Sequence, residues 1–440
     1  MPFKQVRLNE IAAGGGGGLV DGPFGSNLPA TAYVDFGVPV IRGSNLSKGR
    51  FRFRDEGFVF VSQETADKLS RSACQPGDII FTKKGTLGQV GIVPFKSFQR
   101  YLLSSNQMRL RVDNGLANPE YVYYALACPD AIDKVIRESE HTGVPKINLE
   151  YIRQFPILLP DRATQNEVAL FLRAIDERLQ LFEATNTTLE SIARAIFKSW
   201  FIDFDPVCAK VEDRDPDGMD EATAALFPSE FAESELGLIP KGWQLGTFGD
   251  IAINYRRQVR PEDLAQVVTY IGLEHMPRRS IALNEAGTSE GLESGKFLFE
   301  RDDILFGKLR PYFHKVGLAP CSGVCSTDIL VLRPSTTAFH AFVAMHASSE
   351  AMIEYTTRLS NGAKMPRTSW HDVAAFRVAL PPEDIADAFA KLAKGMFERI
   401  YANIEAARTL GELRGTLLPR LISGKLSIPE AEELVQEAIT

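Results

Sequence analysis

The sequence VPKINLEYIRQFPILLP, residues 144–160, recurs later in the chain as MPRTSWHDVAAFRVALP, residues 365–381. Pro145 of the first copy corresponds to Pro366 of the second, an offset in sequence number of 366 − 145 = 221. The same offset continues through the segment that follows each copy, where it pairs Leu179 with Ile400, Leu189 with Leu410, Ile196 with Leu417 and Trp200 with Leu421. The sequence therefore contains a repeat, and the end of the repeat has a constant length.

Upstream of this segment the offset between the two copies changes. Ser104 aligns with Ser326 at an offset of 326 − 104 = 222, Asp78 with Asp303 at 303 − 78 = 225, and Ile41 with Ile271 at 271 − 41 = 230. Loops of different length between matching elements produce such a drift. We therefore predict a duplicated domain with variable loops, followed each time by a helix of fixed length.

Composition places the chain among globular proteins, since 45% of its residues are hydrophobic and 24% are charged. A length of 440 residues allows two or three cores. The chain shows neither an apolar signal segment at its start nor a run of 18 apolar residues. We expect a cytoplasmic protein without a membrane span.

The five cysteines are odd in number and scattered, which favours reduced thiols over a disulfide framework. His314 lies near Cys321 and Cys325, but a metal site would need a fourth ligand with matching spacing, and none stands out. We predict no metal site.

The formal net charge of −7 is unevenly distributed. Residues 203–235 contain eleven acidic side chains against Lys210 and Arg214, and the last eleven residues add four glutamates. The rest of the chain is positive, and most of this excess lies before Leu110. Local charge is therefore compatible with nucleic-acid binding although the total is negative.

Residues 1–160 indicate a mixed α/β domain. Short apolar runs at 58–61, 78–81, 91–93 and 108–112 are bounded by Gly, Pro and Ser, as strands are, and 121–136 has helical spacing. The glycine run 14–18 is typical of a surface loop.

From about residue 164 to 198 apolar side chains advance by threes and fours, which predicts a helix about 50 Å long. Asn186 in the first stripe, and Asn403 and Arg414 in the second, interrupt the apolar pattern. We expect the two helices to pair as an antiparallel coiled coil, with a buried Asn setting the register. Packing of each helix on its own domain alone is the alternative. The residues predicted for helix pairing and subunit docking are Leu172, Ile175, Leu179, Phe182, Leu189, Ile196, Met396, Ile400, Leu410 and Leu417.

The predicted fold class is α+β with a pseudo-twofold internal repeat, in which a pair of long antiparallel helices separates two mixed α/β domains. The connector is acidic and Pro-rich and is expected to hold at most one short helix, near residues 220–226. The predicted segments are domain 1 (1–160), central helix (161–202), connector (203–240), domain 2 (241–382), distal helix (383–426) and acidic tail (427–440).

Several short motifs suggest an enzyme, but their context does not fit. Asn118-Pro119-Glu120-Tyr121 is similar to the adenine-holding loop of amino-methyltransferases, yet it lacks the second proline and a glycine-rich cofactor strand, so a helix start fits better. Residues 85–91 lack the ending of a phosphate loop, so a turn between strands is favoured. Because no nuclease centre or Ser/His/Asp set is found, we predict no catalytic or cofactor-binding residues.

Polar and basic side chains in loops remain as candidates for reading DNA. Arg and Lys suit guanine, and Asn and Gln suit adenine, whereas Lys146, Lys364 and Arg367 suit phosphates. The alternative for each residue is an ordinary solvated side chain. The predicted DNA-binding residues are Arg42, Ser44, Asn45, Lys83, Lys84, Thr86, Gln89, Ser105, Asn106, Gln107 and Lys146 in the first copy and Glu274, His275, Lys308, Arg310, Tyr312, His314, Thr327, Lys364 and Arg367 in the second.

The chain resembles the specificity subunits of type I restriction-modification systems over nearly its whole length. The resemblance rests on the duplicated domain, on the Gly-Asp-Ile-Ile…Gly-Thr-x-Gly pattern at 77–88 and on the helix entry at 157–160. Its most specific part is the connector, at 200–207, 218–220 and 238–243. The second copy departs from the family pattern at 381–385, so the resemblance implies docking more strongly at the central helix than at the distal one.

The resemblance implies a non-catalytic DNA-binding subunit. Each recognition domain would read one half of an asymmetric bipartite site in double-stranded DNA, and the helices would set the unread spacer. Two modification methyltransferase subunits, which bind S-adenosylmethionine and methylate adenine, would dock on the helices, and restriction (motor) subunits would cleave. Two other functions stay open: a DNA adenine methyltransferase acting alone, and a coiled-coil scaffold for protein interactions.

Overall fold

The computed structural model describes residues 3–95, 97–139, 144–360, 362 and 364–439. The chain forms two compact units, the first made of Met1–Gln180 with Thr409–Thr440 and the second of Leu181–Arg408. Both long helices are divided between the units. Each unit therefore combines one sheet-rich domain with a part of each long helix.

The first unit is built on three sheets. Its terminal strand β1 (Lys4–Arg7) pairs antiparallel with β11 (Pro156–Leu159), directly before the long helix. A four-stranded sheet has the order β2-β10-β7-β8 and a five-stranded sheet the order β3-β5-β4-β9-β6. The bounds are β2 Leu19–Asp21, β3 Tyr33–Val34, β4 Val38–Ile41, β5 Val59–Val61, β6 Ala73–Cys74, β7 Ile79–Thr82, β8 Val90–Ile92, β9 Tyr101–Leu103 and β10 Gln107–Leu110.

The second unit repeats this arrangement. β14 (Gln244–Thr247) pairs with β24 (Arg377–Leu380), and sheets β15-β23-β20-β21 and β16-β19-β22-β17-β18 match the other two. The parallel pair β4 and β9 has its counterpart in β17 and β22. The bounds are β15 Ala252–Asn254, β16 Gln258–Val259, β17 Thr269–Ile271, β18 Gly287–Thr288, β19 Lys296–Phe299, β20 Ile304–Gly307, β21 Val316–Leu318, β22 Gly323–Cys325 and β23 Ile329–Pro334. The predicted internal repeat and α+β class are confirmed.

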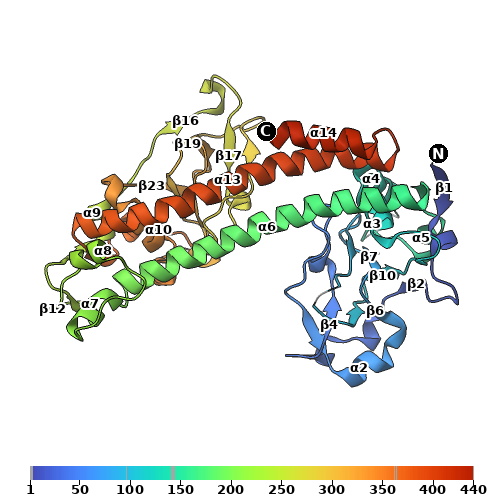
Figure 1. Ribbon diagram of the computed structural model, residues 1–440, viewed down its shortest axis with the longest axis horizontal. Helices are drawn as coiled ribbons and strands as arrows, with labels where there is room; N and C mark the ends of the chain where they lie inside the picture. Colours follow the sequence, from blue (N-terminus) through green and yellow to red (C-terminus); the bar gives the residue numbers. More distant parts are fainter. Residues whose placement is uncertain (1–2, 96, 140–143, 361, 363, 440) are drawn as a thin grey trace. The chain divides into compact units, whose positions relative to one another are not determined.

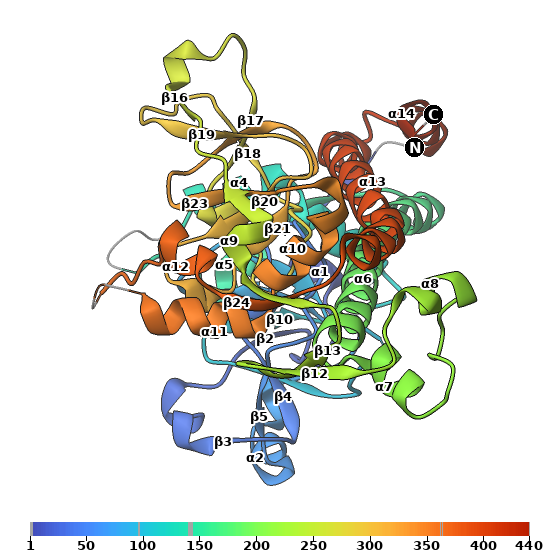
Figure 2. The ribbon, with the colours of Figure 1, turned by 90° about the vertical axis from the view of Figure 1, so that its left-hand side faces the viewer.

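Short helices cover the sheets of both units. The first unit has α1 (Leu8–Ile11), α2 (Gln63–Lys68), α3 (Pro119–Ala127), α4 (Pro129–Arg137) and α5 (Leu149–Gln154). In the second unit α9 (Phe248–Ile251), α10 (His340–Ala347), α11 (Glu350–Leu359) and α12 (Trp370–Ala374) lie beside β20, β21 and β24 (Figure 2). The single helix expected at 121–136 is two helices, because Pro129 ends α3 and starts α4.

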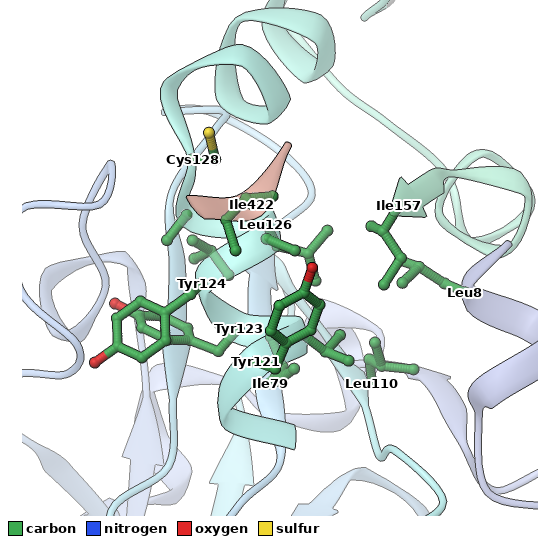
Figure 3. Packing of buried hydrophobic residues seen from close by; sticks show 14 of the residues in the cluster. Leu8, Ile79, Leu110, Tyr121, Tyr123, Tyr124, Leu126, Cys128, Ile157 and Ile422 are labelled. Atoms are coloured by element: carbon green, nitrogen blue, oxygen red, sulfur yellow. The ribbon is translucent and has the colours of Figure 1, made fainter. Parts of the chain in front are cut away.

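The first core forms around α3. Tyr121, Tyr123 and Tyr124 are fully buried there with side chains from β7, β10 and β11, as Figure 3 shows. Leu417, Leu421 and Ile422 of the second long helix belong to the same cluster. The two ends of the chain therefore share one core.

The long helices α6 (Arg162–Phe201) and α13 (Glu383–Ile422) each have 40 residues. They pair antiparallel in both units (Figure 1): Arg414 Nε lies 2.5 Å from Asp176 Oδ1 in the first unit, and Asn403 Nδ2 donates to Asn186 Oδ1 at 2.8 Å in the second. All four side chains are buried. The predicted helix pair and its buried Asn are confirmed. The helices also pack on their own domains, since the Tyr124 hydroxyl donates to Asp176 and Phe201 contacts Phe342.

The residues predicted for the seam differ in burial. Leu172, Ile175, Ile400, Leu410 and Leu417 are buried. The remaining five are half-buried: Leu179, Phe182, Leu189, Ile196 and Met396. The aromatic end of α6, with Phe197, Trp200 and Phe201 packed around Phe389, is an additional contact that the heptad pattern did not indicate.

The connector has more structure than expected. It holds α7 (Asp205–Val211), α8 (Glu221–Leu226) and the hairpin of β12 (Phe231–Ser234) and β13 (Gly237–Pro240). The prediction of at most one short helix was wrong. Val207 and Ala209 of α7 are buried, and Phe227 packs on Trp200 with 5.3 Å between the ring centroids, so the connector has apolar contacts of its own. The acidic tail likewise forms α14 (Ile428–Ile439), whose Ala431 joins the first core.

We expect Arg414→Leu to destabilise the first unit by ~3–5 kcal/mol, because it leaves the buried Asp176 carboxylate without its cation. Urea denaturation of the full chain measures this. Asp176→Leu combined with Arg414→Leu should recover part of the loss, since both charges are then absent. Arg408→Leu on the exposed face of α13 is the control and should change the unfolding free energy by less than about 1 kcal/mol. A loss as small as the control's would contradict a structural role for the pair.

Candidate nucleic-acid interface

Backbone hydrogen bonds tie three distant loops of the first unit together. Lys83 N donates to Asn106 O at 2.8 Å, Gly85 N to Pro145 O at 3.1 Å and Ile147 N to Lys83 O at 2.9 Å. The loops after β7, before β10 and before α5 thus meet at one place. Their side chains are positioned by main-chain contacts rather than by one another.

The second unit has the same set of bonds. Lys308 N donates to Asp328 O at 3.0 Å, Arg310 N to Pro366 O at 2.7 Å and Thr368 N to Lys308 O at 3.0 Å. In each of these bonds the donor and the acceptor are the counterparts of a bonded donor and acceptor in the first unit. The duplication therefore preserves the loop junction itself.

A fourth segment, the 3₁₀ turns Gly43–Asn45 and Leu273–His275, lies beside each junction. Asn45 Oδ1 accepts from Arg42 N at 2.9 Å, and His275 Nδ1 accepts from Gly272 N at 3.0 Å in the equivalent turn. Gln89 joins the first turn to its junction by donating to Gly43 O and accepting from Thr82. In the second unit Lys315 Nζ donates to Leu273 O.

The predicted DNA-binding residues fall into three classes of exposure. Ten are exposed: Ser44, Lys84, Thr86, Asn106, Lys146, Glu274, Tyr312, Thr327, Lys364 and Arg367. Seven are half-buried: Arg42, Lys83, Gln89, Ser105, His275, Lys308 and Arg310. Asn45, Gln107 and His314 are buried. The structure places the exposed groups on the tied loops, and their contact with DNA stays a prediction.

The buried members hold the loops in shape. The Asn45 amide donates to Arg54 O and Glu56 O, and Gln107 bonds Ser104. His314 Nε2 lies 2.8 Å from Ser348 O, and burial lowers the pKa of this imidazole, which favours its neutral form. These bonds use both amide atoms of Asn45, and one of the two polar atoms through which Gln107 and His314 would read bases.

The two junctions present different side chains on the same backbone. Going from the first unit to the second, Ser44 is replaced by Glu274, Lys84 by Leu309, Gly85 by Arg310, Asn106 by Asp328 and Lys146 by Arg367. Arg310 has a left-handed φ of 52° where the first unit has Gly85 at 100°. Two sites of different hydrogen-bonding character result.

Cations at the junctions have acidic neighbours. Lys83 Nζ lies 3.1 Å from Asp21 Oδ1, and Arg367 Nε lies 3.4 Å from Asp328 Oδ1. Such partly exposed pairs contribute less than about 1 kcal/mol, so the cations can exchange partners with little loss.

Sequence reasoning missed the exposed Arg278, whose guanidinium carbon lies 4.1 Å from the Phe313 ring centroid, between the predicted residues Tyr312 and His314 in sequence. Two consecutive arginines, Arg278 and Arg279, shortly after the predicted residue His275 were the sequence signal that could have identified it.

The two enzyme-like motifs have the local structures that the sequence favoured, a helix start and a turn between strands. Asn118 is the N-cap of α3 with Pro119 in its first turn, and residues 83–89 form the turn between β7 and β8. Cys325 is buried whereas Cys321 is exposed, and in the described residues no three His, Cys, Asp or Glu side chains are grouped to hold a metal. No helix in the described part of the chain is long and apolar enough to cross a membrane.

Comparison with known proteins identifies the duplicated scaffold. Residues 30–191 match the family model of the type I restriction modification DNA specificity domain. The chain contains a type I restriction-modification DNA specificity domain. The family recognised from the sequence is thus confirmed.

Relatives extend this similarity along the chain. The HindI specificity subunit of Haemophilus influenzae is 22% identical over 81% of this chain and 88% of its own length. The MjaIX specificity subunit of Methanocaldococcus jannaschii is 22% identical over 92% and 91%. The solved type I S subunit from M. genitalium has 13% identity, a TM-score of 0.55 and 96% coverage of both chains, which shows the shared fold.

We expect Lys84→Ala to weaken DNA binding about equally for all sequences and to lower the salt dependence by about one counterion, because the exposed ammonium suits a phosphate. Fluorescence anisotropy at several salt concentrations measures both quantities. Lys68→Ala on α2 removes the same charge from another exposed site of the unit and is the control. Equal behaviour of the two variants would remove the first junction from the interface.

Proposed function

We propose that this chain is the DNA sequence-specificity subunit of a type I restriction-modification complex. The observation that carries the proposal is the repeated junction, in which one backbone arrangement displays two different sets of side chains. A site read by two unlike surfaces is asymmetric and bipartite. The specificity subunits similar over most of the chain support the same function.

Recognition would proceed through exposed loop groups. In the first unit Asn106 suits adenine edges, and the exposed Lys84 suits a phosphate beside them. In the second unit Glu274 suits the amino group of cytosine, while Arg367 suits guanine or phosphate. Because α6 and α13 keep equal lengths in the two copies, the spacer between the half-sites is expected to be constant.

Chemistry would be supplied by partner subunits. The proposal assigns S-adenosylmethionine and adenine methylation to a modification methyltransferase, and cleavage to a restriction subunit, with no cofactor on this chain. The relatives are described as subunits of restriction enzymes, which supports assembly with other chains.

Methyl transfer from labelled S-adenosylmethionine to DNA tests the function. The chain alone should transfer no label, and the chain with its methyltransferase partner should methylate adenine within two short sequences separated by a fixed unread spacer. Mapping of the methylated positions reads both half-sites. Transfer by this chain alone would establish the methyltransferase alternative instead.

The outer face of α6 is our candidate for partner docking. Leu170, Leu181 and Ile192 are 58%, 52% and 42% exposed and recur every eleven residues, about three helical turns, which puts them on one face. The equivalent positions of α13 are Lys391, Ala402 and Leu413. An exposed apolar stripe on α6 alone favours the central helix as the stronger docking site for the methyltransferase.

Leu181→Asp should reduce co-purification of the methyltransferase subunit at least tenfold, because a carboxylate would be desolvated in the interface. Ala402→Asp at the equivalent exposed position of α13 is the control, with the same new charge. Circular dichroism checks that both variants keep their helices. Full co-purification with Leu181→Asp would exclude this face.

A further inference from the structure

The glycine run of the first unit is an insertion relative to the second unit. In the second unit Ile253 and Asn254 pair with Arg333 and Leu332 without interruption. In the first unit Ala13 N bonds Arg111 O at 2.9 Å, and the next pair is Leu19 with Leu110. Gly14–Gly18 is therefore a five-residue loop inserted into a strand that is continuous in the other copy.

A cavity of about 760 Å³ lies under this loop. Gly14–Gly17 form one side of it, and the lining includes Arg71, Arg100, Arg109 and Arg111. None of the lining residues, all of which are described, is acidic. Four guanidinium groups around one cavity give it a positive potential.

The second unit is closed at the equivalent place. Arg333, the counterpart of Arg111, has its guanidinium carbon 3.6 Å from the Tyr255 ring centroid, so an aromatic ring covers it. The counterpart of Arg109 is the buried Val331, because Val20 pairs with Arg109 whereas Tyr255 N bonds Val331 O. The open loop and the additional arginine both belong to the first unit only.

Charge at the cavity is only partly compensated. Asp78 accepts from both Nε and an Nη of Arg111 at 2.8 Å and lies 3.9 Å from Arg109, and Asp67 pairs with Arg100 at 2.5 Å. Two carboxylates thus face four arginines. Arg71 is exposed at the rim.

Arg109 is the buried member of this group that keeps an N–H without a hydrogen-bond partner. Its side chain is only 5% exposed and donates to the carbonyl oxygens of Ala73 and Gly17, the latter at 2.5 Å. Its Nε has no hydrogen-bond partner within the described residues, and the nearest carboxylate oxygen, Asp78 Oδ2, lies 3.9 Å away, beyond hydrogen-bond distance. A buried guanidinium with a free N–H is costly unless an anion completes its contacts.

We propose that this cavity binds a phosphate group. The guanidinium fork matches phosphate oxygens in geometry and charge. A Cβ on any of Gly14–Gly17 would meet no atom within 4 Å, so close packing is not the reason for glycine here. The φ of +73° at Gly15 and Gly16 favours glycine. Because glycine has no side chain, the backbone of this loop is open to a ligand. The volume exceeds that of phosphate alone, so the phosphate belongs to a larger molecule, either a free nucleotide or the backbone of DNA.

Two measurements distinguish these sources, using the full chain and the variants Arg71→Ala and Arg109→Val. Arg109→Val introduces the residue that the second unit has naturally, and Arg71→Ala changes an exposed side chain, so the fold should survive. Lys68→Ala is the control for loss of one nearby charge. Isothermal titration with inorganic triphosphate measures the affinity for a free phosphate ligand. Fluorescence anisotropy with a random-sequence duplex measures the affinity for the DNA backbone.

Triphosphate binding that both cavity variants weaken at least fivefold, and Lys68→Ala does not, supports the proposal with a free ligand. If triphosphate does not bind, but both cavity variants lower the duplex affinity and the salt slope more than Lys68→Ala does, the phosphate is that of the DNA backbone. Unchanged values in both measurements overturn it. The sequence-specific function does not depend on this outcome, since the loop junctions lie outside the cavity lining.

Discussion

The buried amide pair Asn186–Asn403 is the constraint on which the arrangement of the long helices depends. Two amides buried in an apolar seam satisfy each other only in one register, and a slip by one turn would leave both against hydrocarbon. In the first unit the Asp176–Arg414 pair has the same effect with a larger penalty, because charges are buried. The constant offset between the two copies in this part of the repeat follows from these contacts.

The recognition domains share a different kind of contact. Asp78 with Arg111, and Asp303 with Arg333, are equivalent ion pairs, each with a buried carboxylate and a half-buried arginine, at the start of the strand leading into each loop junction. The junction itself is made of backbone hydrogen bonds, so its geometry does not depend on which side chains it displays. A DNA-specificity protein gains from this division, because side chains at Asn106 or Asp328 can differ while the scaffold stays the same.

The sequence was sufficient for the repeat, for strands β5, β7, β8 and β10, for the helix pair and for the burial of Asn186 in its seam, because these rest on periodicity and spacing. It was insufficient for Asp176, which lies beside the apolar stripe and is explained only by Arg414 across the seam and Tyr124 from α3. It also ranked Asn45, Gln107 and His314 with exposed loop residues. Their side chains turn inward to bond nearby backbone or side-chain groups, and such choices depend on tertiary contacts that residue type does not reveal.

The constant length of the helices and the variable length of the loops both follow from what an insertion does to the contacts around it. One residue inserted in α6 would rotate everything beyond it by about 100° and move the seam residues off the pairing face. Five residues inserted between two pairs of one strand, as at Gly14–Gly18, leave the flanking pairs in register and cost only a slowly growing loop entropy. Duplicated domains can therefore diverge in what they bind, as the open arginine cavity of one copy and the Tyr255-covered strand of the other illustrate, while the helix pair cannot change length without losing its buried polar contacts.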